Sequence, residues 1–283
     1  MTSRKTGDRD VIPESSGIQS PVIPAPAGIQ FLDLGGARLE YLDLPPTRSG
    51  RPELLLLHEG LGSVSMWRDF PQRLASATGS RTLAWSRHGF GRSSPRAAPW
   101  TPRFVHEEAL EVMPALRERL GIARPLLVGH STGASMALVH AGANAWPVAG
   151  VVAMAPLTDV EDSNVEAILA ARREYEAGPW REKLARHHDD VDAVFYGWND
   201  TWLNPHFTAW NLRADLAGIR VPILAILGSE DEYASTAQVE TIRTIATRAA
   251  SFEFLLLPGC GHAPHRDRPD AVIAAVARLL DTV

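Results

Sequence analysis

The stretch Pro125-Leu-Leu-Val-Gly-His-Ser-Thr-Gly-Ala134 decides the fold. Its apolar first half is typical of a buried strand, and the Ala-rich run 134–141 that follows is typical of a helix. Between them lies Gly129-His-Ser-Thr-Gly133, the pattern G-x-S-x-G in the strand–turn–helix context that it requires. Bulky residues at the two glycine positions would clash in so tight a turn, whereas glycine tolerates crowding and unusual dihedrals. Ser131 then projects from the strand end and is the candidate catalytic nucleophile.

An acid is expected to follow the serine along the chain. The apolar run Val221–Leu227 predicts a strand, and Gly228-Ser-Glu-Asp-Glu232 comes directly after it. Acids at the carboxyl end of a parallel strand lie at the same sheet edge as the serine. We prefer Asp231 to its two glutamate neighbours because it lies three residues past Gly228, where the chain leaves the strand and turns towards the serine. Asp159, after an earlier strand, is a rival acid.

The candidate histidine follows the last predicted strand, Phe252–Leu257. The loop Pro258-Gly-Cys-Gly-His262 flanks His262 with glycine, which gives this side chain the freedom to reach between an acid and the serine. The competing His265 lies nearer the final helix, and we expect it on the surface or beside the site. Cys260 is interpreted as a packing residue and not as a nucleophile.

These motifs resemble the α/β-hydrolase superfamily, and the resemblance extends from about residue 30 to the end of the chain. Two further segments carry it. His58-Glu-Gly-Leu-Gly-Ser63 matches the position where the superfamily commonly has His-Gly followed by an oxyanion-hole donor, although Glu59 occupies the usual glycine position. The resemblance therefore implies that the N–H of Gly60 and the N–H of Thr132 form the oxyanion hole. The loop Ser86–Ser93 is similar to the Arg-Gly-x-Gly-x-Ser loop of the family, and we expect it to be structural.

The resemblance implies an α/β fold with a mostly parallel eight-stranded sheet, helices on both faces and a helical lid insertion. The alternation of patterns agrees, and continuous apolar strands are typical of a parallel sheet buried on both faces. The predicted elements are a hairpin (30–34 and 38–44), strands 53–58, 81–86, 125–130, 148–155, 221–227 and 252–257, and helices 65–77, 103–120 and 131–143. A lid is expected at about 157–210, where helical patterns carry many aromatic residues that either line a pocket or pack the lid onto the body.

Residues 1–29 differ in composition from the rest. Val11–Gln19 is echoed by Val22–Gln30, and the segment is rich in Pro, Gly and Ser without a helical or strand period. We interpret 1–29 as a disordered tail with a short tandem repeat, and 30–283 as the hydrolase-like domain.

The composition excludes several classes of function. A formal net charge of −5 offers no basic field for nucleic acid. No apolar run approaches the roughly 18 residues of a membrane helix, so no membrane partner is expected. The single Cys260 rules out an internal disulfide and a cysteine-based zinc cluster, and it favours a cytoplasmic location. His187-His-Asp-Asp190 is similar to metal ligands in composition only, so neither a metal nor a cofactor is expected. The sequence leaves the oligomeric state open.

The pattern predicts a serine hydrolase that acts on a small-molecule carboxylic ester, lactone or thioester through Ser131, His262 and Asp231. Two alternatives remain. The resemblance to small bacterial lid-bearing esterases also covers C–C hydrolases of ring-fission dienoates, for which Arg87, Arg92 and Trp198 are candidate carboxylate ligands. The other alternative is a small-molecule receptor on the same fold, although an intact set of three catalytic residues argues against it.

Overall fold

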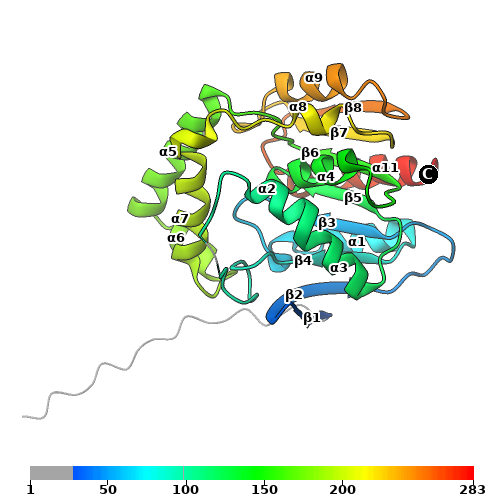
Figure 1. The fold of residues 1–283 in the computed structure, drawn as a ribbon, viewed down its shortest axis with the longest axis horizontal. Helices are drawn as coiled ribbons and strands as arrows, with labels where there is room; N and C mark the ends of the chain where they lie inside the picture. Colours follow the sequence, from blue (N-terminus) through cyan, green and yellow to red (C-terminus); the bar gives the residue numbers. More distant parts are fainter. Residues whose placement is uncertain (1–27, 98) are drawn as a thin grey trace, which may run out of the picture.

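The short apolar runs of the sequence form the strands of one sheet (Figure 1). The computed structural model describes residues 28–97 and 99–283. The expected α/β architecture is confirmed: eight strands lie in the order β1-β2-β4-β3-β5-β6-β7-β8. β1 and β2 pair antiparallel, β2 meets β4 antiparallel, and all further pairs are parallel. The strands are β1 (Ile29–Leu34), β2 (Ala37–Leu44), β3 (Leu54–Leu57), β4 (Thr82–Trp85), β5 (Leu126–His130), β6 (Gly150–Met154), β7 (Ile223–Gly228) and β8 (Phe252–Leu257).

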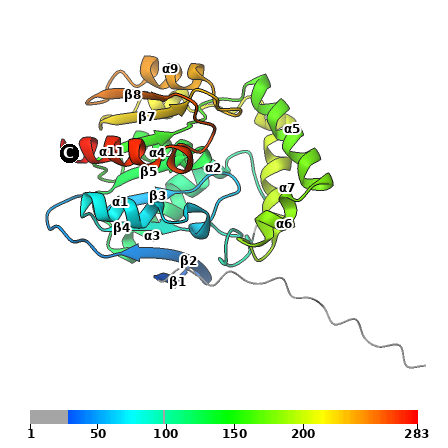
Figure 2. The same cartoon turned by 180° about the vertical axis from the view of Figure 1, so that it is seen from behind.

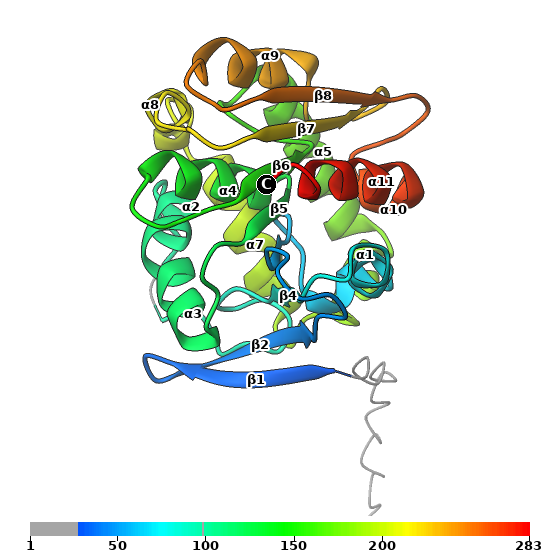
Figure 3. The same ribbon diagram turned by 90° about the vertical axis from the view of Figure 1, so that its right-hand side faces the viewer.

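Helices cover both faces of the sheet, as Figure 3 shows with α1 and α11 on one side and α2, α3 and α4 on the other. Successive side chains of a strand point to opposite faces, so each strand contributes to two cores. Leu55 and Leu127 belong to the core under α4, whereas Leu56 and Val128 belong to the core under α1 and α11. The helices of the sheet body are α1 (Phe70–Thr78), α2 (Phe104–Glu107), α3 (Met113–Leu120), α4 (Thr132–Ala143), α8 (Arg213–Leu216), α9 (Thr236–Ile245), α10 (Pro264–Asp267) and α11 (Pro269–Leu280).

The single helix predicted at 103–120 is wrong in detail. The chain forms α2, then a π-helical turn at Glu108–Val112, and then α3. Pro114 stands in the first turn of α3, and a proline has no N–H to donate to the carbonyl four residues earlier. The wider turn before it accommodates that missing hydrogen bond.

The helix predicted at 65–77 is also divided. A 3₁₀ turn at Val64–Trp67 precedes α1, and Arg68 between them adopts a φ of 54°. A residue with a positive φ cannot continue a right-handed helix, so the two pieces are separate.

A group of helices stands at one end of the sheet, between β6 and β7. It consists of α5 (Asp162–Ala177), α6 (Trp180–Ala185) and α7 (Val191–Trp202), followed by a 3₁₀ turn at Pro205–Phe207. Figure 2 shows α5, α6 and α7 together at the end opposite the C-terminus. We refer to residues 157–210 as the inter-strand segment. The segment lies where the sequence predicts an insertion, and residues 1–27 of the expected tail lie outside the described part of the chain.

Candidate active site

Ser131 occupies a sharp turn between β5 and α4. Its φ is 52° and its ψ is −120°, a combination that a non-glycine residue adopts only when its surroundings impose it. Its N–H donates to the carbonyl of Met154 on the neighbouring strand (2.8 Å), which holds the turn against the sheet. Because Thr132 is the first residue of α4, its N–H has no carbonyl partner within the helix.

The glycines on either side of the turn are required by crowding. A Cβ atom on Gly133 would overlap the carbonyl oxygen of Leu57, and a Cβ atom on Gly129 would overlap the backbone of Gly133. The expected clash is therefore confirmed. The unusual dihedrals, however, belong to Ser131, since neither of these glycines has a positive φ.

Asp231 and His262 meet across two loops. His262 Nδ1 donates to Asp231 Oδ1 (2.8 Å), and the same oxygen accepts the N–H groups of Tyr233 and Ala234. Burial alone would raise the pKa of Asp231, but the hydrogen bond and charge of His262, together with those two N–H groups, hold this pKa below its ordinary value. A carboxylate at Nδ1 fixes the tautomer, so Nε2 is the unprotonated nitrogen of a neutral ring.

Gly228 lets these two loops approach each other. A Cβ atom at Gly228 would overlap the carbonyl oxygens of Cys260 and Gly261. The N–H of Glu230 donates to Cys260 O (2.9 Å), which joins the acid loop to the histidine loop. The buried Cys260 thus packs in the loop, and burial raises the pKa of its thiol to about 11.

The rival residues lie elsewhere. Asp159 forms a β-bridge with Asn211, and its carboxylate approaches Arg213 at 3.7 Å. His265 is buried against the rings of Trp67 and Phe70, and its ring lies 4.8 Å from that of His130, which lines the cavity. Of its two expected positions, the one on the surface was wrong and the one beside the site is confirmed. The short helix α10 turns this side chain inward under aromatic cover, which a position near the last helix does not reveal.

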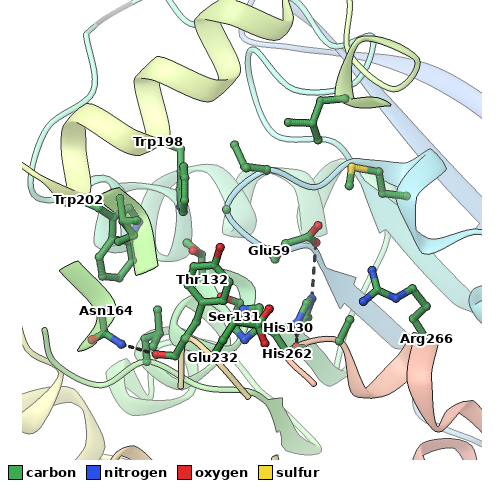
Figure 4. Close-up of a pocket in the computed structure, with 18 of the residues that line it drawn as sticks. Glu59, His130, Ser131, Thr132, Asn164, Trp198, Trp202, Glu232, His262 and Arg266 are labelled. Carbon is green, nitrogen blue, oxygen red and sulfur yellow. Dashed lines mark hydrogen bonds and ion pairs between the residues drawn. The ribbon is translucent and has the colours of Figure 1, made fainter. Parts of the chain in front are cut away.

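Ser131 and His262 line one cavity of about 230 Å³ at the carboxyl ends of the strands (Figure 4). No hydrogen bond joins Ser131 to the His262 ring in the described part of the chain, and such bonds are often long without substrate. Gly60 and Thr132 also line the cavity. The remaining lining residues from the sheet body are Glu59, Leu61, Met66, His130, Glu232, Tyr233, Ala263 and Arg266.

The inter-strand segment supplies the opposite wall. Its lining residues are Leu157, Asn164, Ile168, Trp180, Leu184, Trp198 and Trp202. Other aromatic residues of the segment pack instead: Tyr175 stacks on Phe195 with ring centroids 3.6 Å apart, and Phe207 stacks on Trp210. The sequence predicted that these aromatic residues either line a pocket or pack, and different residues of the segment do each.

Glu59 and His130 lie at the site, although the sequence analysis gave neither of them a role. Figure 4 shows His130 between the carboxylate of Glu59 and His262. His130 Nε2 donates to the carbonyl of His262 (2.6 Å), and its Nδ1 lies 3.6 Å from Glu59 Oε2. Burial would raise the pKa of Glu59, but the adjacent His130 and the nearby His58 outweigh it and hold this pKa well below its usual range. The only sequence signal for this pair was that Glu59 occupies a position where the superfamily commonly has glycine.

The arginines proposed for a dienoate carboxylate do not line the cavity. Arg87 directs its guanidinium to backbone carbonyls, and the backbone N–H of Arg92 donates to Glu40 Oε2 (3.1 Å). Trp198 does line the cavity, as does Arg266. The choice of Arg87 and Arg92 was wrong because the loop 86–93 turns into the body, where Ser86 donates to the buried Glu40.

The histidines of the segment 187–190 bind the body through hydrogen bonds. His188 Nδ1 accepts the N–H of Gly91 (2.9 Å), and its Nε2 donates to Leu61 O (2.8 Å). His187 pairs with Ser65 Oγ. Over residues 28–97 and 99–283, no group of three His, Cys, Asp or Glu side chains is arranged to hold a metal ion, and no helix there has the length and apolar character to cross a membrane.

Comparison with known proteins shows the family to which the chain belongs. The model of the alpha/beta hydrolase family matches residues 54–275. A proline iminopeptidase of Lactobacillus helveticus is 25% identical over 285 residues, covering 85% of this chain and 94% of that protein. An sn-1-specific diacylglycerol lipase of Mus musculus is 24% identical, covering 81% of each. The solved enol-lactonase from Burkholderia xenovorans LB400 superposes with a TM-score of 0.69 at 23% identity, covering 89% of this chain and 100% of that one. Since the family model spans most of the chain, the protein belongs to the alpha/beta hydrolase family and is a hydrolase.

Proposed function

We propose that the protein is a serine hydrolase of small carboxylic esters, lactones and thioesters included, with Ser131 as nucleophile, His262 as base and Asp231 as the acid. One observation carries the proposal. The strained Ser131 lines the same cavity as His262, and the hydrogen bond from His262 Nδ1 to Asp231 leaves Nε2 unprotonated on the ring. A nucleophile, a base and a group that orients the base are the parts that acyl transfer requires.

The reaction proceeds in two halves. His262 Nε2 takes the proton of Ser131 Oγ as the oxygen attacks the ester carbonyl, and the imidazolium returns that proton to the leaving alkoxide. Water then attacks the acyl-enzyme, again giving its proton to His262, and collapse releases the acid and restores Ser131. The N–H groups of Gly60 and Thr132 bind the oxyanion in both halves, and each is worth about 3 kcal/mol of barrier by analogy with single-donor deletions.

The relatives support acyl transfer as the common chemistry. The diacylglycerol lipase and the enol-lactonase act by name on an ester and a lactone, and the iminopeptidase acts on an amide. We choose the ester because the cavity wall from the inter-strand segment is mainly apolar and aromatic, which suits an acyl or alcohol group. In this proposal the segment 157–210 acts as the lid.

The C–C hydrolase alternative is less favoured on electrostatic grounds. A dienoate substrate carries a carboxylate, and Glu59 and Glu232 both line the cavity. The low pKa of Glu59 keeps its carboxylate charged at neutral pH, so an anionic substrate meets repulsion beside Gly60. Arg266 on the same wall is the feature that keeps the alternative open.

A fluorophosphonate probe and a substrate panel test the proposal. We expect the probe to label Ser131 of the wild-type protein and not Ser131→Ala. We also expect Ser131→Ala to lower kcat for a p-nitrophenyl ester at least about 10³-fold, as for other disrupted triads, with an unchanged melting temperature. Near-full ester hydrolysis by Ser131→Ala would refute the nucleophile. Faster turnover of a ring-fission dienoate than of any ester would transfer the assignment to C–C hydrolysis, and a wild-type protein with neither labelling nor turnover would be a receptor.

A further inference from the structure

The carbonyl oxygen of Glu59 is held by three donors at once. It accepts from Arg87 Nη2 (2.7 Å), from His58 Nδ1 (2.8 Å) and from the N–H of Gly62 (3.2 Å). A carbonyl oxygen has two lone pairs, so this one is fully occupied and its direction is fixed. The donors come from the loops that follow two neighbouring strands, β3 and β4.

The direction of this carbonyl also sets the direction of the Gly60 N–H. The two groups belong to one planar peptide unit, and every described peptide bond is trans. In a trans unit the N–H points opposite to the C=O, so holding Glu59 O towards Arg87 turns the Gly60 N–H the other way. Gly60 lines the cavity beside Ser131, and its N–H makes no hydrogen bond to any residue within 28–97 and 99–283.

Arg87 is built to hold this arrangement. It is buried, and its Nη1 donates to the carbonyl of His58 (2.7 Å), so the guanidinium clamps two successive carbonyls of the loop. The N–H of Arg87 itself donates to His58 Nε2 (3.2 Å), which leaves the proton of that ring on Nδ1, facing Glu59 O. The guanidinium also lies 4.6 Å from the centre of the Phe90 ring.

We propose that Arg87 is a positioning residue of the oxyanion hole, which aims the Gly60 N–H at the oxyanion by clamping the carbonyls of His58 and Glu59. The inference rests on the proposed function, because Gly60 matters only if Ser131 forms a tetrahedral intermediate. It gives the loop 86–93 a part in the reaction although none of its residues lines the cavity. Arg87 is charged, so its hydrogen bond also polarises the Glu59–Gly60 peptide and strengthens the N–H as a donor.

The charge on Arg87 persists at neutral pH. Burial lowers the pKa of Arg87 to about 10, while the nearby carboxylates Glu108 and Glu59 act in the opposite direction. The guanidinium is therefore protonated over the whole working range of a histidine base. A neutral substitute would leave two carbonyls facing a buried void and free the loop to turn.

Arg117 provides a matched control. It is also buried, and its Nη2 donates to the carbonyls of Ala123 and Pro147 (2.7 Å each), but it lies outside the set of residues that line the cavity. Removing it should lower stability, as removing Arg87 should, but without any effect on an oxyanion.

The experiment compares Arg87→Lys, Arg87→Met and Arg117→Lys by melting temperature, by kcat and KM for a p-nitrophenyl ester, and by inhibition with a trifluoromethyl ketone, which forms a tetrahedral adduct with the serine. We expect Arg87→Met to lower kcat about 10²-fold, the size of a lost oxyanion donor, with KM changed less than about threefold. Arg87→Lys, which reaches one carbonyl, should be intermediate. The affinity for the ketone should fall in proportion to kcat/KM, and Arg117→Lys should change the melting temperature alone.

The outcomes separate the inference from the proposed function. If kcat of a folded Arg87 variant equals the wild-type value, or falls without a matching loss of ketone affinity, Arg87 does not position the oxyanion hole. If Arg87→Met fails to fold, Arg87→Lys decides, since it keeps the charge in the same space. Labelling of wild-type Ser131 by the fluorophosphonate is independent of all these variants, so its failure overturns the proposed function and not merely the role of Arg87.

Discussion

Two regions meet at the cavity, and they build their walls in different ways. On the sheet body the groups are set by backbone: the φ of Ser131, the close contact of Gly133 with Leu57 and that of Gly228 with Cys260. The inter-strand segment contributes side chains from helices, chiefly the indoles of Trp180, Trp198 and Trp202. A backbone contact without room for a methyl group cannot change without moving a strand, whereas an indole can be replaced on an intact helix.

Because of this difference, we expect the sheet body to determine the reaction and the inter-strand segment to determine which substrates bind. Residues fixed by the sheet body have the constant geometry that bond-breaking steps require, because small displacements of reacting atoms are costly. Residues on the segment determine the shape of the cavity and can vary with the compound bound. Substitutions in the body should therefore affect every substrate alike, and substitutions in the segment should change their ranking.

The largest expected effect comes from the acid in the body. Asp231→Asn should lower kcat for all esters about 10⁴-fold, as an amide in place of the carboxylate stabilises the wrong tautomer of His262 in triads of this kind. Asp159→Asn is the matched control, because it removes the same charge from the neighbouring loop, and its kcat should stay within a fewfold of the wild-type value. Steady-state kinetics on purified variants measure both. An inactive Asp159→Asn beside an active Asp231→Asn would place the acid on the other strand.

A smaller effect is expected where the two regions touch. A Cβ atom at Gly60 would overlap the indole nitrogen of Trp198, and Gly60 has no positive φ to add strain. Gly60→Ala should therefore lower kcat/KM roughly 10- to 100-fold, because the donor is displaced and not removed, and removal of a donor costs about 10²- to 10³-fold. In a Trp198→Ala background the same substitution should cost less than about threefold, a coupling that a double-mutant cycle measures.

Trp198→Ala alone is the single variant of that cycle that changes the inter-strand segment. It should raise KM and change the order of preference among acyl groups while leaving kcat for the smallest ester nearly constant. If the effects of Gly60→Ala and Trp198→Ala on kcat/KM were additive, the indole would not be the group that limits the size of residue 60. Uniform loss of kcat in Trp198→Ala would remove the distinction between the two regions.

The smallest expected effect is on stability in acid, at the contact that docks the segment. Burial lowers the pKa of His188 to about 4, well below the roughly 6.5 of an unfolded histidine. As pH falls below 6.5 the unfolded chain takes up this proton first, so the folded state loses stability, by up to about 1.4 kcal/mol per pH unit for each such group. Once protonated, Nδ1 can no longer accept the N–H of Gly91.

Calorimetry between pH 7 and 4.5 checks this. His188→Gln should show a shallower fall of the free energy of unfolding with decreasing pH than the wild type. His140 is the matched residue within the body, because burial lowers its pKa to about 4 as well. His140→Gln should flatten the same profile but leave KM in acid unchanged, whereas His188→Gln should alter KM. Identical pH profiles for wild type and His188→Gln would contradict the buried neutral state.

Much of the sheet was predictable because its signals are local. Leu54–Leu57 and the run before Gly129 are apolar at every position, which is typical of strands covered on both faces, and both are strands. The helix at 103–120 was predicted as one piece, since a periodic pattern does not reveal how Pro114 disturbs the turn before it. The segment between β6 and β7 was predicted as helical, but its pattern did not separate the lining Trp198 from the packed Phe195.

The sequence by itself determined the turn at Ser131, because two glycines and a strand before them leave the chain few conformations. It also determined that an acid and a histidine follow strands at the same sheet edge. Only the tertiary structure decided that Asp231 meets His262, that Glu59 faces His130, and that Arg87 clamps the loop of Gly60. These contacts join residues from separate strand ends, and their distances depend on how the sheet twists and how closely its loops pack, which no local pattern encodes.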